Sequence, residues 1–350
     1  MNLTRQNVLP GMLDFDSPGR RDYWVMLEHD TSWGHYFIPL TVIVGPRAEK
    51  GRGVAASGSN HGNEYEGPVV LKNLLRELRT EDVLGRIILI PVLNPAAFRA
   101  GTRESTLDDG VNLNRAFVDG AGKTAALAGI THRIAAFVRD ILFPQVHVWI
   151  DLHAGGNVCR FALCTSFHPI ENARQSREIE AAARWFGTPL VLIYQNSTPG
   201  LLPSDAERLG KIMIGGEFGW GDAVNTEGVR YARHGVLAAC INHGQLKGQI
   251  EKTGHHAAGA QRLVEMVDPA CFSAAPWPGH FQPLFECGES VHKGQVAGLL
   301  HDFHRIDEAP FEIKANHDGI IIAQAWSARV QQGQQVLCVG KKLEFSGKES

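Results

Sequence analysis

The sequence predicts an α/β fold with a layered, mostly parallel or mixed sheet, followed by a small all-β module. Over the first 270 residues, apolar runs of strand length alternate with helical patterns. From about residue 276, short apolar segments alternate with turns centred on glycine, and two similar phrases appear, VHKGQV at 291–296 and VQQGQQV at 330–336. We therefore predict one domain over residues 1–270 and a C-terminal β module over residues 271–350.

The individual elements of the first domain follow from the spacing of apolar residues. Apolar runs predict strands at 23–29, 35–44, 54–56, 86–93, 146–152, 160–164, 189–194 and 211–218. Helical spacing predicts helices at 65–79, 125–142, 171–186 and 226–246. The stretch from 94 to 119 is polar without a long apolar period, and a loop of this length inside a compact domain is usually functional.

Composition narrows the class of protein. The chain has 350 residues, of which 44% are hydrophobic and 20% are charged, so it can bury a sizeable core. A net charge of −3 gives no basic excess for nucleic-acid binding, and apolar runs such as 87–93 are too short to span a bilayer. The first residues lack the apolar stretch of a signal peptide, and the six cysteines form no CxxC pair. We expect a cytoplasmic protein with reduced thiols.

A candidate metal site begins in the stretch 57–64, where His61 and Glu64 lie between a short strand and a helix. Zinc accepts imidazole nitrogen together with carboxylate oxygen. Taken alone, however, this motif more often consists of a loop histidine and a first-turn helix acid. His153 ends another apolar strand, where an α/β sheet normally places its active site. These three residues predict one Zn²⁺ per subunit with a position left open for water. Asp151 lies on the same strand face and is a candidate partner for a ligand imidazole.

Further residues could perform the chemistry beside such a metal. Glu217 follows the apolar strand and two glycines at 212–216, and it could accept a proton from a metal-bound water. The alternative is a structural acid in a salt bridge. Asn114 and Arg115 suit a substrate carboxylate, and Arg103 could stabilise an oxyanion. Each arginine taken singly could instead form a surface ion pair.

Taken together, these motifs resemble the succinylglutamate desuccinylase/aspartoacylase family over about residues 30–250. The shared motifs, in order, are His61-Gly62-Asn63-Glu64, Asn94-Pro95, Thr102-Arg103, Asn112-Leu113-Asn114-Arg115 and Asp151-Leu152-His153. The resemblance implies a zinc-carboxypeptidase-like α/β/α domain with a mixed sheet. It also implies zinc on the three ligands named above, Glu217 as general base, Arg103 on the scissile carbonyl, and Asn114 and Arg115 on the α-carboxylate.

Three features depart from aspartoacylase. The interval between Arg103 and Asn114 is longer, Asn112 replaces the usual Asp, and Glu217 lies in an unusual Gly-Gly-Glu-Phe-Gly-Trp-Gly context that includes Trp220. Overall likeness is greatest to the N-acetyl-L-2,4-diaminobutyrate deacetylases of ectoine degradation. We therefore expect hydrolysis of a small N-acyl amino acid. The alternatives are an N-succinylglutamate or N-acetylaspartate deacylase, a metallocarboxypeptidase, and a non-enzymatic carrier or scaffold.

The C-terminal module resembles the biotinyl/lipoyl-type hybrid barrel through its V-x-x-G-Q turns and the Asp318-Gly319 phrase. The Met-Lys-Met hairpin that carries the prosthetic group is replaced by HDFHRID at 301–307, so we expect no attachment of such a group. The module would then pack on the first domain, shape access to the site, or contact another copy in a homo-oligomer. A less favoured alternative is a second metal on nearby histidines. These histidines are His301, His304 and His317, and separately His255 and His256.

Overall fold

The apolar runs form the middle of a long mixed sheet. The computed structural model describes residues 6–28, 34–118, 129–194 and 198–346. The strand order is β1-β2-β3-β5-β4-β6-β10-β8-β9-β11-β19-β17-β14, with β12 paired to β19 and β7 paired to β17. β5, β4, β6 and β10 run parallel to one another, whereas β2, β3 and β8 introduce antiparallel pairs. The predicted mixed sheet is therefore confirmed.

The strands and helices have the following bounds. The strands are β1 (Gln6–Val8), β2 (Gly19–Glu28), β3 (His35–Val44), β4 (Gly53–Gly58), β5 (Arg86–Ile90), β6 (Val146–Leu152), β7 (Cys159–Phe161), β8 (Cys164–Phe167), β9 (Leu190–Tyr194), β10 (Ile212–Glu217), β11 (Arg262–Met266), β12 (Phe272–Ala274), β13 (Gly279–Pro283), β14 (Ser290–Val291), β15 (Val296–His301), β16 (Phe311–Lys314), β17 (Gly319–Ala325), β18 (Arg329–Val330) and β19 (Gln335–Leu343). The helices are α1 (Glu66–Glu77), α2 (Pro95–Ala100), α4 (Ile130–Phe137), α5 (Ala173–Arg184), α6 (Leu202–Arg208), α7 (Thr226–Asn242) and α8 (Gly254–Ala257).

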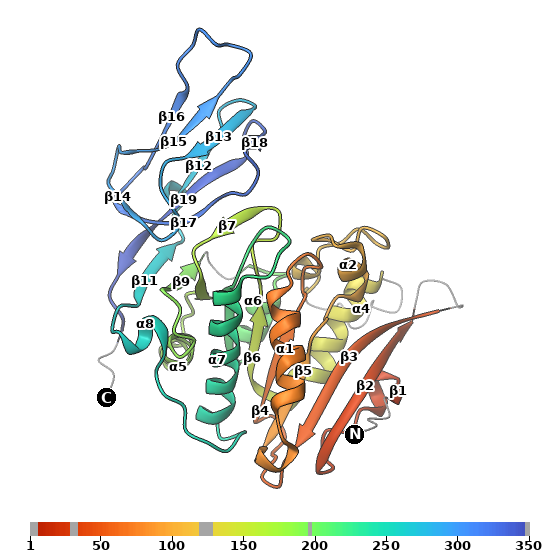
Figure 1. Cartoon of the computed structure of the whole chain (residues 1–350). Helices are drawn as coiled ribbons and strands as arrows, with labels where there is room; N and C mark the ends of the chain where they lie inside the picture. The colour runs from red at the N-terminus through yellow and green to blue at the C-terminus, as the bar shows by residue number, and fades with distance from the viewer. Residues whose placement is uncertain (1–5, 29–33, 119–128, 195–197, 347–350) are drawn as a thin grey trace.

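Helices cover both faces of the sheet. The apolar sides of α1, α5 and α7 join one core cluster, and those of α4 and α6 join the other. Figure 1 shows α1 and α7 next to each other in front of the central strands. In α1, Val70, Leu71 and Leu74 are fully buried, and each contributes about 1.5–3 kcal/mol of hydrophobic stabilisation. The three layers are thus held by the helical spacing seen in the sequence.

Several boundaries differ from the prediction. The region 160–164 holds the two strands β7 and β8, and α6, α8 and β11 were not predicted. The polar stretch 94–119 contains α2, because the Asn94 side chain accepts a hydrogen bond from the Ala97 amide and Pro95 suits the first helical turn. α4 begins at Ile130 and passes into a π-helical turn, Val138–Leu142. Residues 125–128 of the predicted helix and residue 29 of the first predicted strand lie outside the described ranges.

The C-terminal strands have a core of their own and also extend the main sheet. Phe281, Leu300 and Val336 belong to an apolar cluster whose members all lie within 275–339. In the two V-x-x-G-Q turns, Gly294 and Gly333 both have a left-handed backbone with φ of 79°. β19 pairs antiparallel with β11, and β17 pairs with β7. The division at residues 270/271 and the hybrid-barrel resemblance stay predictions.

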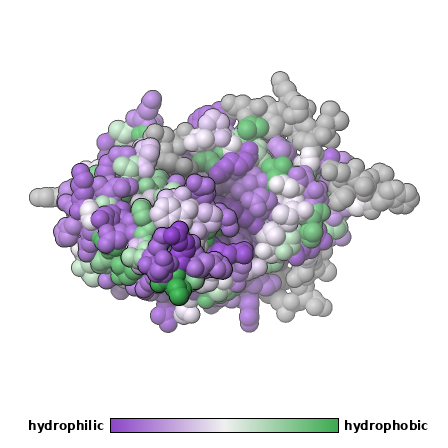
Figure 2. Space-filling model, turned by 90° about the horizontal axis from the view of Figure 1, so that it is seen from above, coloured by the Kyte–Doolittle hydropathy of each residue, from purple (hydrophilic) through white to green (hydrophobic). Residues whose placement is uncertain are grey.

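The central strands end at one edge of the sheet. β4 and β6 are parallel neighbours in which Ser57 lies beside Asp151, and β10 is the parallel neighbour of β6 on its other side. The loops that follow these three strands therefore meet above the carboxyl edge. Seen from above, the surface is hollowed near its centre and the hollow is bordered mainly by hydrophilic residues (Figure 2). Within the described ranges, no helix combines the length and apolarity needed to cross a membrane.

Candidate active site

His61 and Glu64 lie in the tight connection between β4 and α1. Ser59 has a left-handed backbone with φ of 55°, which turns the chain sharply after the strand. A Cβ atom at Gly62 would lie 2.0 Å from the backbone of Ala97, so glycine is needed for the loop to pack against α2. This packing leaves the side chains of His61 and Glu64 each only 2% exposed.

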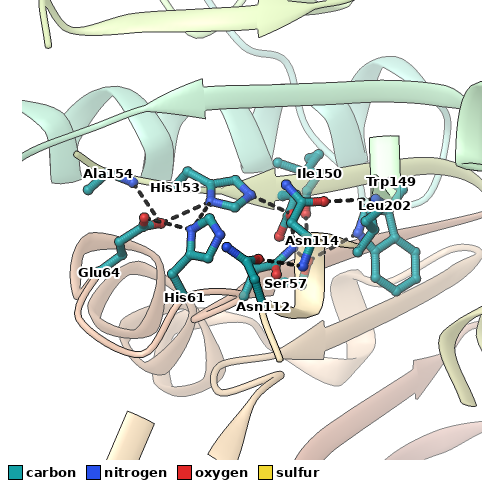
Figure 3. A network of polar contacts seen from close by, with 12 residues as sticks. Ser57, His61, Glu64, Asn112, Asn114, Trp149, Ile150, His153, Ala154 and Leu202 are labelled. Carbon is teal, nitrogen blue, oxygen red and sulfur yellow. Dashed lines mark hydrogen bonds and ion pairs between the residues drawn. The ribbon is translucent and has the colours of Figure 1, made fainter. Parts of the chain in front are cut away.

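Three potential metal ligands converge at the carboxyl edge (Figure 3). Nδ1 of His61 lies 2.7 Å from Oε1 of Glu64, and Nδ1 of His153 lies 2.9 Å from Oε2 of the same carboxylate. The two Nδ1 atoms are 3.2 Å apart, a spacing that needs a shared proton or a cation between them. Two imidazole nitrogens and a carboxylate within 4.8 Å of one another form the donor set of a catalytic zinc centre. These residues therefore fit the metal that the motifs implied.

Asp151 holds the second nitrogen of one ligand. Its Oδ2 atom accepts from Nε2 of His153 at 2.8 Å, which directs Nδ1 of that ring toward Glu64. The carboxylate is fully buried and also accepts from the Ser57 hydroxyl and the Asn60 amide, each at 2.8 Å. Sequence reasoning identified Asp151 but missed Ser57 and Asn60. The strand pairing that brings 57 beside 151 was the missing information.

Charge is concentrated in this small buried volume. Burial lowers the pKa of His61, whereas the carboxylates of Asp151 and Glu64 outweigh burial and raise the pKa of His153 well above its usual value. Burial alone would raise the pKa of Glu64, but the two imidazoles lower it overall. Burial, with the nearby Glu64 charge, raises the pKa of Glu217 to about 8. The carboxylates thus differ in proton affinity because their environments differ.

Backbone pairing fixes Glu217 beside His153. The His153 amide donates to the Gly216 carbonyl at 3.0 Å, and the Phe218 amide donates to the His153 carbonyl at 2.9 Å. Glu217 lines a cavity of about 130 Å³, and its buried Oε2 atom has no hydrogen-bond partner among the described residues. A buried carboxylate oxygen without a partner costs free energy unless water or a ligand satisfies it. This geometry suits a group that exchanges protons with a bound molecule.

The arginines and Asn114 complete the lining of the cavity. Arg103 lies 3.2 Å from Oε1 of Glu64, so its guanidinium sits at the ligand cluster. Oδ1 of Asn114 accepts from the Leu202 amide at 2.8 Å, which leaves its NH₂ group to donate elsewhere. Arg115 is largely exposed and donates to the Asn114 carbonyl at 2.6 Å. The structure thus brings every predicted site residue to one place.

Other predicted histidines do not form a comparable cluster. His301 bonds to Gln282 through Nε2 at 2.9 Å, and His317 bonds through Nδ1 to the Asp318 carbonyl. Within residues 6–28, 34–118, 129–194 and 198–346, the His61 group is the one set of three such side chains close enough to share a metal. The cavity wall formed by Ser166 and Tyr194 was not foreseen, because neither residue belongs to a recognisable motif.

Comparisons with known proteins identify the family. Residues 50–241 match the catalytic-domain model of the succinylglutamate desuccinylase/aspartoacylase family. The N-alpha-acetyl-L-2,4-diaminobutyric acid deacetylase of Halomonas elongata is 30% identical over 352 residues, which cover 98% of each chain. The resemblance inferred from the motifs is therefore confirmed.

Solved structures give the same result for the fold. A succinylglutamate desuccinylase/aspartoacylase from Rhodobacter sphaeroides is 30% identical with a TM-score of 0.86, covering 95% of this chain and 98% of the other. The product-bound ectoine utilization protein EutE (DoeB) from Ruegeria pomeroyi is 30% identical with a TM-score of 0.84, covering 94% and 98%. Because the family model matches more than half of its length and a relative of 30% identity covers nearly all of it, the chain belongs to the succinylglutamate desuccinylase/aspartoacylase family.

Proposed function

We propose that this protein is a zinc-dependent deacylase that hydrolyses the amide bond of N-acetyl-L-2,4-diaminobutyrate. The observation that carries this proposal is the convergence of His61, Glu64 and His153 next to the cavity that Glu217 lines. The substrate assignment is supported by the name of the Halomonas elongata relative and by the ectoine utilization protein of similar structure. The products would be acetate and the free amino acid.

Each proposed residue has a defined task. His61, Glu64 and His153 would hold the zinc, which when bound acidifies water and polarises a carbonyl group. Glu217 accepts the proton of the attacking water and donates it to the departing nitrogen. Burial raises its pKa to about 8, which favours the protonated form needed to donate to the nitrogen, and the charge of a bound zinc would favour the carboxylate form needed to accept from water. Arg103 adds positive charge where the oxyanion develops.

The substrate carboxylate would bind at Asn114 and Arg115. The Asn114 oxygen is already committed to Leu202, so its two N–H groups are the part available to a ligand, and a carboxylate accepts such donors. Arg115 lines the same cavity and provides a planar guanidinium for bidentate pairing. The cavity of about 130 Å³ places these two residues beside Glu217 and His153, which line it as well.

The test combines metal analysis with turnover. Purified wild-type protein should bind one zinc ion per chain and release acetate from N-acetyl-L-2,4-diaminobutyrate. Glu217→Gln should keep the zinc but lower kcat by about 10²–10⁴-fold, the range expected for loss of a general base. His61→Ala should lose the metal as well. Near wild-type turnover by Glu217→Gln would refute the assigned role, and zinc-free wild-type activity would refute the metal dependence.

A control variant separates the loss of a base from a general defect. Glu178→Gln removes an α5 carboxylate that pairs with Arg174 on the outer surface. We expect this variant to match wild type in zinc content and kcat. Assays with N-succinylglutamate and N-acetylaspartate would show whether another acyl amino acid is preferred. Such a preference would change the substrate but not the class of reaction.

A further inference from the structure

One wall of the cavity comes from three neighbouring strands that no site motif includes. Ser166 of β8 pairs with Leu192 of β9, and Tyr194 at the end of β9 pairs with Met266 of β11. Because alternate residues of a strand share a face, these side chains lie together, and all four line the cavity that holds Glu217. The wall therefore combines two hydroxyl groups with two aliphatic side chains.

Both hydroxyl groups are available to a ligand. Neither Ser166 nor Tyr194 has a side-chain hydrogen-bond partner among the residues that the structure describes. A Cβ atom placed on Gly215 would come within 2.9 Å of the Ser166 hydroxyl, so the glycine keeps the space in front of this group open. Hydroxyl oxygens accept hydrogen bonds as well as donate them. The two hydroxyl groups can therefore accept hydrogen bonds from the N–H groups of a ligand.

Buried residues fix the ring of Tyr194 from one side. The imidazole of His168 contacts the Tyr194 ring with centroids 4.4 Å apart. His168 is fully buried, and its Nδ1 atom lies 2.8 Å from the Glu207 carboxylate, whose side chain is 2% exposed. This pair restricts the tyrosine without using its hydroxyl group. The aromatic face and the hydroxyl then remain in place for contact with a bound molecule.

Several carboxylates interact electrostatically with Tyr194. After burial, the charges that most raise the pKa of its phenol are the carboxylates of Glu207, Glu217 and Asp151, while Arg115 acts in the opposite direction. Burial disfavours any charge at this position, but an ionised carboxylate nearby also attracts a cation. Arg115, by contrast, makes its own part of the cavity favourable for an anion. The cavity thus offers separate regions for a carboxylate and for a positive group.

We propose that Tyr194, with Ser166 beside it, recognises the side-chain ammonium group of the substrate. The ammonium would donate to the two hydroxyl oxygens, and the methylene groups would pack against Leu192 and Met266. This assignment rests on the proposed deacylase function and specifies the class of substrate: an acyl amino acid with a cationic side chain. A second carboxylate, as in acetylaspartate, would face the negative region without a cationic partner.

Matched substrates test the assignment. N-acetyl-2-aminobutyrate has the carbon skeleton of the diaminobutyrate substrate but lacks the amine. Tyr194→Phe should lower kcat/KM for N-acetyl-2,4-diaminobutyrate by roughly tenfold to a hundredfold, the effect of losing a hydrogen bond to a charged group. The same variant should change kcat/KM for the aminobutyrate analogue by less than about twofold. Ser166→Ala should produce a smaller loss with the same selectivity.

Controls separate this inference from the proposed function. Tyr231→Phe removes a hydroxyl that bonds to Glu227 on α7, outside the cavity, and should leave both substrates unaffected. Equal losses on both substrates in Tyr194→Phe, or no loss on either, would overturn the recognition role while the deacylase assignment stands. A zinc-loaded wild-type enzyme that hydrolyses neither substrate would overturn the function itself. In calorimetry, the wild-type protein should bind 2,4-diaminobutyrate more tightly than 2-aminobutyrate, and equal affinity would also overturn the inference.

Discussion

Replacing Asp151 by Asn should weaken zinc binding while the fold stays intact. The carboxylate accepts from His153 and Asn60 through Oδ2 and from Ser57 through Oδ1. An amide with its oxygen at the Oδ2 position keeps the first two bonds. Its NH₂ group then faces the Ser57 hydroxyl, which can accept if its own proton turns to the Ile150 carbonyl 3.4 Å away. The substitution therefore removes the charge and little else.

The expected loss of zinc affinity follows from the effect of the Asp151 charge on His153. A carboxylate behind a ligand imidazole raises the basicity of that ligand, and losing such a partner typically costs about 10–100-fold in metal affinity. This corresponds to about 1.4–2.8 kcal/mol. Competition with a chromophoric chelator at fixed pH would measure the zinc dissociation constant of each variant. We expect a tenfold or greater increase for Asp151→Asn.

A matched variant tests whether loss of any buried carboxylate would weaken zinc binding. Asp205 on α6 is also buried, and its carboxylate lies 2.7 Å from the guanidinium of Arg139. Among the residues that the structure describes, it makes no contact with the zinc ligands. Asp205→Asn should lower thermal stability and leave zinc affinity unchanged. If Asp151→Asn binds zinc as tightly as wild type, the carboxylate does not support the ligand and the reasoning fails.

Other perturbations follow from the same geometry. Gly62→Ala should destabilise the protein by about 1–3 kcal/mol or more, because its Cβ would lie 2.0 Å from the Ala97 backbone; an unchanged denaturant midpoint would contradict this. Arg115→Ala should raise KM by about tenfold with a smaller effect on kcat, because a charge-assisted contact to the substrate is lost. An unchanged KM in steady-state kinetics would show that Arg115 does not contact the substrate. Removing zinc with a chelator should lower the melting temperature by several degrees. A ligand at a thousand times its dissociation constant adds about 4 kcal/mol to the free energy of unfolding. Calorimetry with and without metal provides the check.

The site could be predicted from sequence where short spacing determines geometry. His61 and Glu64 are three residues apart at a strand-to-helix turn, so they face one point whatever the rest of the fold does. His153 and Glu217 end parallel strands, and such ends share an edge of the sheet. These rules need no knowledge of strand order.

The unpredicted parts depend on long-range pairing. Ser166 and Tyr194 reach the cavity because β8 runs antiparallel to β10 and parallel to β9, an arrangement that apolar periodicity does not reveal. His168 and Glu207 meet although they are far apart in the chain. Arg86 is another example: it begins an apolar strand and is 1% exposed, because its guanidinium donates to the Phe15 carbonyl and to Asp16.

The antiparallel pairing of β11 with β19 determines whether the chain can be cut into two stable parts. Residues 263–265 pair with 341–343, so β19 joins the C-terminal strands to the sheet that begins near the N-terminus. A chain cut after residue 270 would expose an unpaired strand edge with Leu263 and Val264, which are buried in the full protein. Exposed edges of this kind invite aggregation. We therefore expect the two segments to unfold in a single cooperative transition and the truncated chain to be poorly soluble.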